Sequence, residues 1–248
     1  MNELDSAADR KHQIKAFVLC GGLGTRLRPV LSDRPKSMAL VGGVPFLQLL
    51  LARVRSQGVG QVILGTGYMA EQIEDFFRDG QDLALRISYS REHEPLGTGG
   101  ALKLAEPMLS DPVLVLNGDS FVEWSLVATL ELFTKRDAAA VVVLQAVPDV
   151  ARYGSVTIDP DGRMTEFVEK GTRTGPGLIN AGVYLLRKEM VSALPAGTAV
   201  SLEKDVFPER SGKVFGLVSD GLFIDIGIPA DLERAQLLLG PQARSDRR

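Results

Sequence analysis

Residues 19–29 read LCGGLGTRLRP, and the rest of the chain is arranged around this stretch. The apolar run that leads into it, residues 14–20, predicts a buried first strand. Glycines at the carboxyl end of a strand allow backbone N–H groups to approach a phosphate closely. Arg26 and, further on, Lys36 supply the positive charge that a phosphate also needs. The residues expected in this phosphate-binding loop are Leu19, Gly21, Gly22, Gly24, Thr25 and Arg26.

Two better-known phosphate-binding loops do not fit these residues. The pattern G-x-x-x-x-G-K-[ST] is absent, because no Lys-Ser or Lys-Thr follows a glycine at that spacing. The dinucleotide fingerprint G-x-G-x-x-G fails at its last position, where Leu27 stands in place of the third glycine. A nicotinamide-dependent dehydrogenase is therefore disfavoured. The plainest structural alternative is a tight turn that carries a solvated arginine.

Composition and charge exclude several classes of protein. The 248 residues carry a formal net charge of −3, which gives no general attraction to nucleic acid or to a membrane. The longest apolar run is far shorter than the ~20 residues that a membrane span needs. Cys20 is the only cysteine, so an intrachain disulfide is impossible and the chain fits a reducing cytoplasm. We expect Cys20 to be buried and inert, and no feature indicates an oligomeric state.

The order of apolar patterns in the first half predicts an α/β fold. Strands are expected at residues 14–20, 61–64, 83–89, 112–116 and 138–147. Helices are expected at residues 44–57, 70–77 and 126–136, and behind a second glycine-rich loop at residues 92–100. This alternation indicates a mostly parallel twisted sheet flanked by helices, which binds ligands beyond the carboxyl ends of its strands.

The second half changes character. Strands are expected at residues 154–158, 163–168, 178–186 and 222–226, before a helix at residues 229–239. The short connections predict a small antiparallel addition at the edge of the sheet. We expect flexible tails at residues 1–13 and 241–248 and a single domain between them. Its halves would be residues 14–147, for a nucleotide, and residues 148–240, for a sugar phosphate.

Two aspartates close apolar strands and are candidate metal ligands. Asp119 ends the segment Asn117-Gly118-Asp119, and Asp225 lies in the run FIDIG. A charge at such a position is costly when buried without a partner, and two carboxylates could converge on one Mg²⁺. The alternative is that each aspartate caps a turn or pairs with an arginine. No Ser-His-Asp or Cys-His arrangement stands out, so the chemistry points to phosphates and not to a protein nucleophile.

Taken together, these motifs resemble the sugar-1-phosphate nucleotidylyltransferases over nearly the whole chain. The segments that carry the resemblance are LCGGLGTRLR, PKSMA, EPLGTGGA, NGDS, INAGVY and SLEKDVFP. They look most like the guanylyltransferases that act on D-glycero-α-D-manno-heptose 1-phosphate for capsule or S-layer glycan synthesis. The resemblance implies a cytoplasmic, Mg²⁺-dependent transferase with a Rossmann-like nucleotidyltransferase fold, whose partners are GTP and a sugar 1-phosphate.

The resemblance also implies roles for individual residues. Asp119 and Asp225 would ligate the metal, while Arg26 and Lys36 would act on the phosphates of the nucleotide. The sugar-phosphate residues would be Glu169, Lys170, Asn180 and Glu203. The nucleotide residues would be Leu19, Gly21, Gly22, Gly24, Thr25, Arg26, Glu92, Gly97, Thr98, Asn117 and Gly118. The alternative for Glu203 is a helix that Ser201 caps, with Glu203 or Lys204 on a solvated face.

The choice of base and of sugar is the least determined part. Glu92 and Glu94 precede the second glycine-rich segment, and a carboxylate only accepts hydrogen bonds. Guanine offers a carboxylate two adjacent donors, whereas uracil and thymine offer one, so a glutamate that reaches the base favours guanine. A guanylyl-, uridylyl- or thymidylyltransferase for mannose, glucose or N-acetylmuramate 1-phosphate remains an alternative. So does a catalytically inactive sensor of nucleotide sugars.

Overall fold

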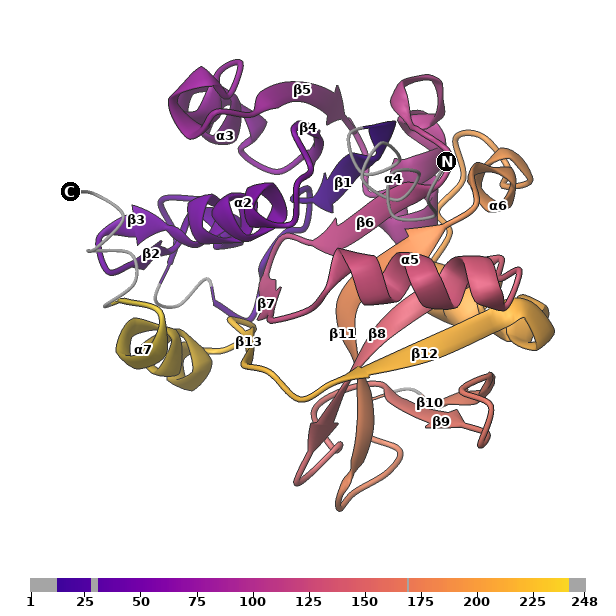
Figure 1. Cartoon of the computed structure of the whole chain (residues 1–248). Helices are drawn as coiled ribbons and strands as arrows, with labels where there is room; N and C mark the ends of the chain where they lie inside the picture. The colour runs from indigo at the N-terminus through magenta and orange to yellow at the C-terminus, as the bar shows by residue number, and fades with distance from the viewer. Residues whose placement is uncertain (1–12, 28–30, 169, 241–248) are drawn as a thin grey trace. The chain divides into compact units, whose positions relative to one another are not determined.

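The structure, a computed structural model, describes residues 13–27, 31–168 and 170–240 (Figure 1). The chain divides into two compact units. Unit 1 comprises Met1–Pro95, Asn117–Phe121 and Ile224–Arg248, and unit 2 comprises Leu96–Leu116 and Val122–Phe223. The predicted tails lie outside the described residues, except for Gln13. The predicted single domain with halves that meet at residue 147 stays a prediction.

Unit 1 is built on the parallel strands β1 (Lys15–Leu19), β4 (Gln61–Thr66) and β5 (Arg86–Arg91), with β4 between the others. The connections carry α2 (Phe46–Ser56) and α3 (Ala70–Phe77), as parallel strands require. Phe17 and Val18 are fully buried, which explains why β1 reads as a continuous apolar run. The remaining elements are η1 (Lys36–Met38), β2 (Leu40–Val41), β3 (Val44–Pro45), η2 (Gln81–Leu83) and α7 (Pro229–Leu238).

Unit 2 is organised around β11 (Gly177–Leu186). This strand pairs antiparallel with β6 (Val113–Asn117), β8 (Ala140–Val147) and β9 (Ser155–Ile158). β10 (Met164–Val168) continues the antiparallel part beside β9, whereas β12 (Val214–Ser219) runs parallel to β8. The other elements are α4 (Gly97–Leu104), η3 (Glu106–Met108), α5 (Leu126–Lys135), α6 (Lys188–Ser192), η4 (Leu202–Val206) and η5 (Pro208–Lys213). Figure 1 shows α5 against β8 and β12.

These elements confirm the predicted fold class, a mixed α/β fold whose mostly parallel central sheet is flanked by helices and extended by antiparallel strands. The short strands β7 (Ser120–Val122) and β13 (Phe223–Asp225) pair with each other. Cys20 is buried as expected, and this burial raises the pKa of its thiol, which makes it a poor nucleophile. None of the described helices has the length and the apolar character that a membrane span requires.

Several elements differ from the sequence-based expectation. The predicted strand at residues 83–89 begins only at Arg86, because residues 81–83 form the turn η2. The predicted helix at residues 44–57 begins at Phe46, because Val44 and Pro45 pair with β2. The strand β12 was not predicted at all. Its Gly216 packs so tightly on β8 that a Cβ there would lie 2.4 Å from Leu144, so a glycine that looks like a breaker is a requirement of packing.

The second glycine-rich segment is a loop only over residues 92–96, because its four residues from Gly97 form the first turn of α4. Gly97 has φ +69°, a region that favours glycine, and a Cβ there would lie 2.6 Å from the carbonyl oxygen of Val200. A Cβ on Gly100 would lie 2.5 Å from the carbonyl oxygen of Thr198. The Gly99 N–H donates to the Val200 carbonyl at 2.8 Å. The glycines therefore allow residues 198–200 to pack directly on the helix backbone.

Candidate active site

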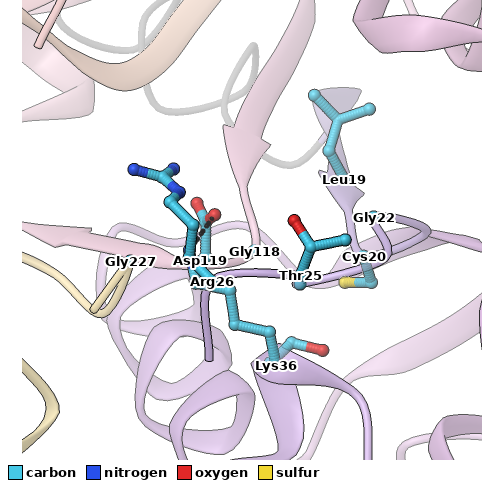
Figure 2. Close-up of a pocket in the computed structure, with 11 residues that line it drawn as sticks. Leu19, Cys20, Gly22, Thr25, Arg26, Lys36, Gly118, Asp119 and Gly227 are labelled. Carbon is cyan, nitrogen blue, oxygen red and sulfur yellow. Dashed lines mark hydrogen bonds and ion pairs between the residues drawn. The ribbon is translucent and has the colours of Figure 1, made fainter. Parts of the chain in front are cut away.

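The predicted phosphate-binding loop lines a cavity of about 190 Å³ in unit 1 (Figure 2). The loop leaves β1 at Leu19 and turns at Gly24, whose φ of +58° favours glycine. The Leu27 N–H donates to the Gly24 carbonyl at 3.0 Å and closes the turn. Predicted residues that line the cavity are Leu19, Gly22, Gly24, Thr25, Arg26, Lys36, Gly118 and Asp119.

Gly118 brings the segment that carries Asp119 against the end of β1. Its N–H donates to the Leu19 carbonyl at 3.0 Å, and a Cβ on it would lie 2.7 Å from that same oxygen. A larger residue at position 118 would push the segment away from the loop. The predicted residue Asn117, which ends β6, is half-buried beside it. The close approach places the carboxylate of Asp119 in the wall of the cavity.

A cluster of one lysine and two aspartates forms the charged part of this site. The Lys36 Nζ lies 2.6 Å from Asp119 Oδ2 and 3.7 Å from Asp225 Oδ1. Asp119 and Asp225 are held together by their backbones, since the Ile226 N–H donates to the Asp119 carbonyl at 3.0 Å. The sequence predicted all three residues, and the structure brings them together from distant parts of the chain. We call this set the acidic cluster.

One carboxylate oxygen of Asp225 lacks a hydrogen bond from the described residues. This oxygen, Oδ1, is buried. Burial raises the pKa of Asp225, and the negative charge of Asp119 raises it further, while Lys36 acts in the opposite direction. Gly227 leaves Oδ1 the space it occupies, because a Cβ there would lie 2.8 Å from that oxygen. A buried carboxylate oxygen that accepts no hydrogen bond from the described residues is suited to a ligand from outside the chain.

The acidic cluster fits a divalent cation that also binds phosphate oxygens. Its carboxylates supply hard oxygen ligands, and the lone oxygen of Asp225 would gain a partner. Among the described residues, no group of three or more His, Cys, Asp or Glu side chains gathers as a complete metal cage. Mg²⁺ is commonly held by one or two carboxylates together with substrate phosphates, and this donor set matches that pattern.

Glu92 lies across the phosphate-binding loop, whereas Glu94 is exposed. A Cβ on Gly21 would lie 2.4 Å from Glu92 Oε1, and a Cβ on Gly67 would lie 3.0 Å from Glu92 Cγ. The Glu92 N–H donates to the Thr66 carbonyl at 2.9 Å and fixes the backbone there. The structure therefore favours Glu92 over Glu94 as the glutamate associated with the loop. The predicted Gly21 makes room for this side chain.

In unit 2, a second polar group surrounds Glu203, and we call it the hydroxyl cluster. Thr98 and Ser201 each donate a hydroxyl hydrogen bond to Glu203 Oε2, at 2.8 and 2.9 Å. The hydroxyl of Tyr184 donates to Glu203 Oε1 at 2.7 Å, and Asn180 Nδ2 donates to the same hydroxyl at 2.8 Å. Asn180 and Glu203, predicted together as sugar residues, are therefore joined through Tyr184.

The hydroxyl cluster bears on two expectations from the sequence. Ser201 caps η4 by accepting from the Lys204 N–H at 3.2 Å, and Lys204 is exposed, but Glu203 is half-buried. Thr98, predicted among the nucleotide residues, contacts Glu203 in this structure. The nucleotide contacts predicted for Gly97 and Thr98 stay predictions. Tyr184 was missed, although its spacing of four from Asn180 along a strand was a usable signal for a shared face.

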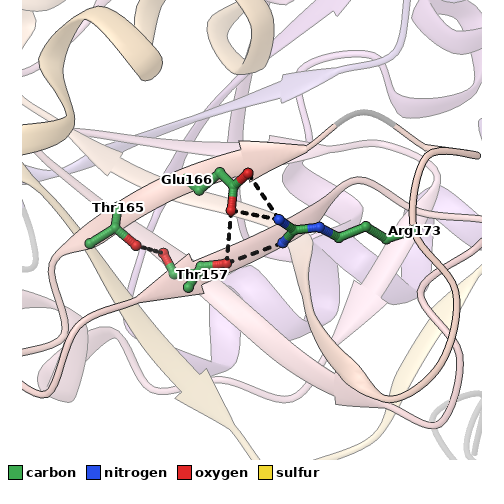
Figure 3. Close-up of polar contacts among 4 residues, drawn as sticks. All are labelled: Thr157, Thr165, Glu166 and Arg173. Carbon is green, nitrogen blue, oxygen red and sulfur yellow. Dashed lines mark hydrogen bonds and ion pairs between the residues drawn. The ribbon is translucent and has the colours of Figure 1, made fainter.

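The loop that carries Lys170 is fastened to the β9–β10 hairpin. Arg173 Nη2 donates to both carboxylate oxygens of Glu166, at 2.9 and 2.8 Å, and Nη1 reaches Thr157 at 3.4 Å (Figure 3). The Gly171 N–H donates to the Ala151 carbonyl at 2.9 Å. Lys170 itself is exposed, so its ammonium group is accessible to an anion. The predicted residue Glu169 lies outside the described part of the chain.

Comparisons with known proteins agree with this geometry. A family model described as Nucleotidyl transferase matches residues 15–238. The D-glycero-α-D-manno-heptose 1-phosphate guanylyltransferase of Aneurinibacillus thermoaerophilus is 39% identical over 226 residues, which cover 90% of this chain and 97% of that protein. The mannose-1-phosphate guanylyltransferase of Mycobacterium tuberculosis is 37% identical over 228 residues, but this chain spans only 64% of its length.

A solved structure shows the same fold. HddC from Yersinia pseudotuberculosis complexed with GMP-PN superimposes with a TM-score of 0.80 at 38% identity, over 90% of this chain and 98% of that chain. The family model extends from the strand before the phosphate-binding loop to the last described helix, and so includes both the acidic and the hydroxyl cluster. The chain therefore belongs to the nucleotidyl transferase family.

Proposed function

We propose that this chain transfers the GMP group of GTP to D-glycero-α-D-manno-heptose 1-phosphate, giving GDP-heptose and pyrophosphate. An oxygen of the sugar phosphate attacks the α-phosphorus, and the bond from that phosphorus to the oxygen of the leaving pyrophosphate breaks. The sugar phosphate is already ionised at neutral pH, so no general base is needed. The observation that carries the proposal is the acidic cluster beside a glycine-rich loop. The 39% identity to a heptose 1-phosphate guanylyltransferase supports the choice of substrates.

The residues of unit 1 would bind and orient the triphosphate. Arg26, exposed at the mouth of the loop, and Lys36 would offset the repulsion between two polyanions and align them. Asp119 and Asp225 would hold Mg²⁺. When bound, the cation would supply Lewis-acid stabilisation of the charge that develops on the phosphate oxygens. Release of Lys36 from Asp119 would free its ammonium group for the triphosphate.

Glu92 supports a preference for guanine. Its side chain crosses Gly21 and Gly67 and so lies over the loop that would hold the phosphates. A carboxylate in this place accepts from the ring N–H and the exocyclic amine of guanine, which no other common nucleotide base offers side by side. A solved relative complexed with GMP-PN supports the same preference.

The residues of unit 2 would bind the sugar phosphate. Lys170, exposed on its fastened loop, would pair with the phosphate, and Glu169 is proposed to act with it. Asn180 and Glu203 would bind hydroxyl groups of the sugar. We also propose that the protein works in the cytoplasm, where its product would serve surface-glycan synthesis, since its cysteine is free and buried.

The direct test is release of pyrophosphate by the purified chain with Mg²⁺. It crosses GTP, ATP, UTP and dTTP with the 1-phosphates of the heptose, mannose and glucose. Release with GTP and the heptose phosphate alone supports the proposal. Release with another pair keeps the nucleotidyl transfer and discards the substrate. No release from folded protein that still binds GTP points to the inactive sensor.

Mannose 1-phosphate is the second candidate for the sugar. The mannose-1-phosphate guanylyltransferase of M. tuberculosis shares 37% identity with this chain over 228 residues. In the crossed assay, a higher kcat/KM for mannose 1-phosphate than for the heptose phosphate would favour this candidate. The roles proposed for the acidic cluster would be unaffected.

A further inference from the structure

The hydroxyl cluster has a fixed direction of hydrogen bonding. Asn180 Oδ1 accepts from the Gly182 N–H at 2.9 Å, so its amide group can present only Nδ2 to Tyr184. The Tyr184 hydroxyl therefore accepts from Asn180, and its single proton must go to Glu203 Oε1. No other assignment of protons satisfies both distances. The phenol hydroxyl therefore accepts from the amide and donates to the carboxylate.

The two other hydroxyl groups follow the same rule. Thr98 Oγ1 accepts from the Leu202 N–H at 2.8 Å and gives its proton to Glu203. Ser201 Oγ accepts from the Lys204 N–H and also gives its proton to Glu203. Glu203 is thus an acceptor of three hydrogen bonds from the described chain. Since a carboxylate offers about four acceptor positions, about one is left for a ligand.

Tyr184 is the member of the cluster that is most firmly held. It is fully buried, and its ring packs on the ring of Phe207 with centroids 5.5 Å apart. It lies in β11, in the stretch between Asn180 and Tyr184 where the pairing of β11 with β8 is irregular. A rigid phenol on a strand can fix the orientation of Glu203, which belongs to the short π-helical turn η4.

We propose that Tyr184 is a positioning residue for sugar recognition. It orients the amide of Asn180 and the carboxylate of Glu203 so that each presents one defined position, and Glu203 accepts a single sugar hydroxyl. This inference rests on the sugar-binding role proposed above for Asn180 and Glu203. Tyr184 itself has no contact with the sugar, because its side chain is fully buried and its single hydroxyl proton goes to Glu203.

The substitution Tyr184→Phe tests the inference, since it removes one oxygen and keeps the ring. We expect the KM for the sugar 1-phosphate to rise about tenfold, because one hydrogen bond to a charged group is lost and two side chains lose their orientation. The KM for GTP is expected to stay within about twofold of the unsubstituted value. Calorimetric titration with the sugar 1-phosphate gives the same ratio as a dissociation constant. The assay uses whichever sugar phosphate releases pyrophosphate fastest.

Two further variants make the result unambiguous. Tyr89→Phe is the matched control, because Tyr89 donates its hydroxyl to the Arg78 carbonyl at 2.6 Å, and its loss should leave both KM values unchanged. Thr98→Val removes another donor to Glu203 outside β11 and should reproduce the selective rise even if the Tyr184 variant folds poorly. A rise in the sugar-phosphate KM alone, in either variant, supports the inference.

Two results would count against the proposals and can be told apart. Equal changes in both KM values, or none, in folded Tyr184→Phe and Thr98→Val would overturn the positioning role, provided that Glu203→Ala weakens sugar binding. An unchanged sugar-phosphate KM in Glu203→Ala would instead overturn the sugar site itself and the inference with it.

Discussion

The acidic cluster and the hydroxyl cluster use carboxylates in opposite ways. In the first, Asp225 keeps a buried oxygen with no hydrogen-bond partner in the described part of the chain, and the neighbouring Asp119 makes its charge more costly. In the second, Glu203 accepts three hydroxyl protons and is almost completely satisfied. The difference distinguishes a site that lacks partners until a cation binds from a site whose hydrogen bonds are already formed before a sugar hydroxyl binds.

This contrast has an energetic meaning. A carboxylate whose partners are missing destabilises the folded chain until a ligand supplies them, as is common where binding or catalysis takes place. A carboxylate that is almost completely satisfied by the chain stabilises the fold, and its geometry is set before any ligand binds. Substitution of Asp225 should therefore lower activity without a loss of stability in Asp225→Asn, whereas substitution of Glu203 should lower stability.

The largest effect is expected from Asp225→Ala. Loss of this proposed metal ligand should lower kcat about 1000-fold, while binding of GTP survives in part through the loop and Lys36. Steady-state release of pyrophosphate with a separate GTP titration measures both quantities. Asp220→Ala, at an exposed aspartate five positions earlier, is the control and should keep full activity. Normal turnover in the Asp225 variant would remove that residue from the metal site.

The next largest effect is a loss of stability in Glu203→Gln. The amide would place N–H groups against hydroxyl protons, so at least one hydrogen bond is lost inside the cluster. We expect the free energy of unfolding to fall by about 2 kcal/mol, measured by chemical denaturation. An unchanged stability would show that the hydroxyl cluster is not the assembled network described here.

A smaller, selective effect is expected from Lys170→Ala. Removal of this exposed ammonium group should raise the KM for the sugar 1-phosphate about tenfold and leave the KM for GTP nearly unchanged. Lys135→Ala, at an exposed lysine at the end of α5, serves as the control. Equal rises in both KM values would move Lys170 out of the sugar-phosphate site.

The smallest expected effect is a gain of stability in Asp225→Asn. It tests the comparison of the two clusters most sharply. Since burial and Asp119 raise the pKa of Asp225 in the folded chain, its ionised form costs stability above that pKa. The variant should be more stable than wild type at neutral pH without divalent cations, as measured by chemical denaturation. The gain should fade as the pH falls through the raised pKa towards the ordinary value, because the wild-type carboxyl then becomes neutral too. A variant less stable than wild type at neutral pH would contradict the proposed cost.

The sequence predicted the acidic cluster well for a physical reason. Asp119 and Asp225 each close an apolar strand, and Lys36 follows a strand-end loop, so the fold class alone places them near the ligand edge. The hydroxyl cluster was only half predicted. Asn180 and Glu203 were named, but their link through Tyr184 depends on the irregular register of β11 and the π-helical turn η4, which no local pattern reveals.

The same limit applies to the glycines. Those around Gly24 were interpreted correctly as a turn, because they follow a strand and precede basic residues. Gly97 and Gly216 were assigned to a loop or overlooked, because the reason for each lies in a segment far away in the sequence. Gly97 is required by Val200, and Gly216 by Leu144. Close packing between distant segments is not visible in a single sequence without an alignment.

The central claim is that the acidic cluster binds a divalent cation, whereas the hydroxyl cluster is held together by its own hydrogen bonds and does not. It is tested most directly by Mn²⁺ titration. Electron paramagnetic resonance would measure free Mn²⁺ in the presence of GTP for wild type, Asp225→Asn and Glu203→Gln. We expect Mn²⁺ affinity to fall at least about tenfold in Asp225→Asn and to stay at the wild-type value in Glu203→Gln. Equal Mn²⁺ affinity in wild type and Asp225→Asn, or a loss confined to Glu203→Gln, would contradict the account.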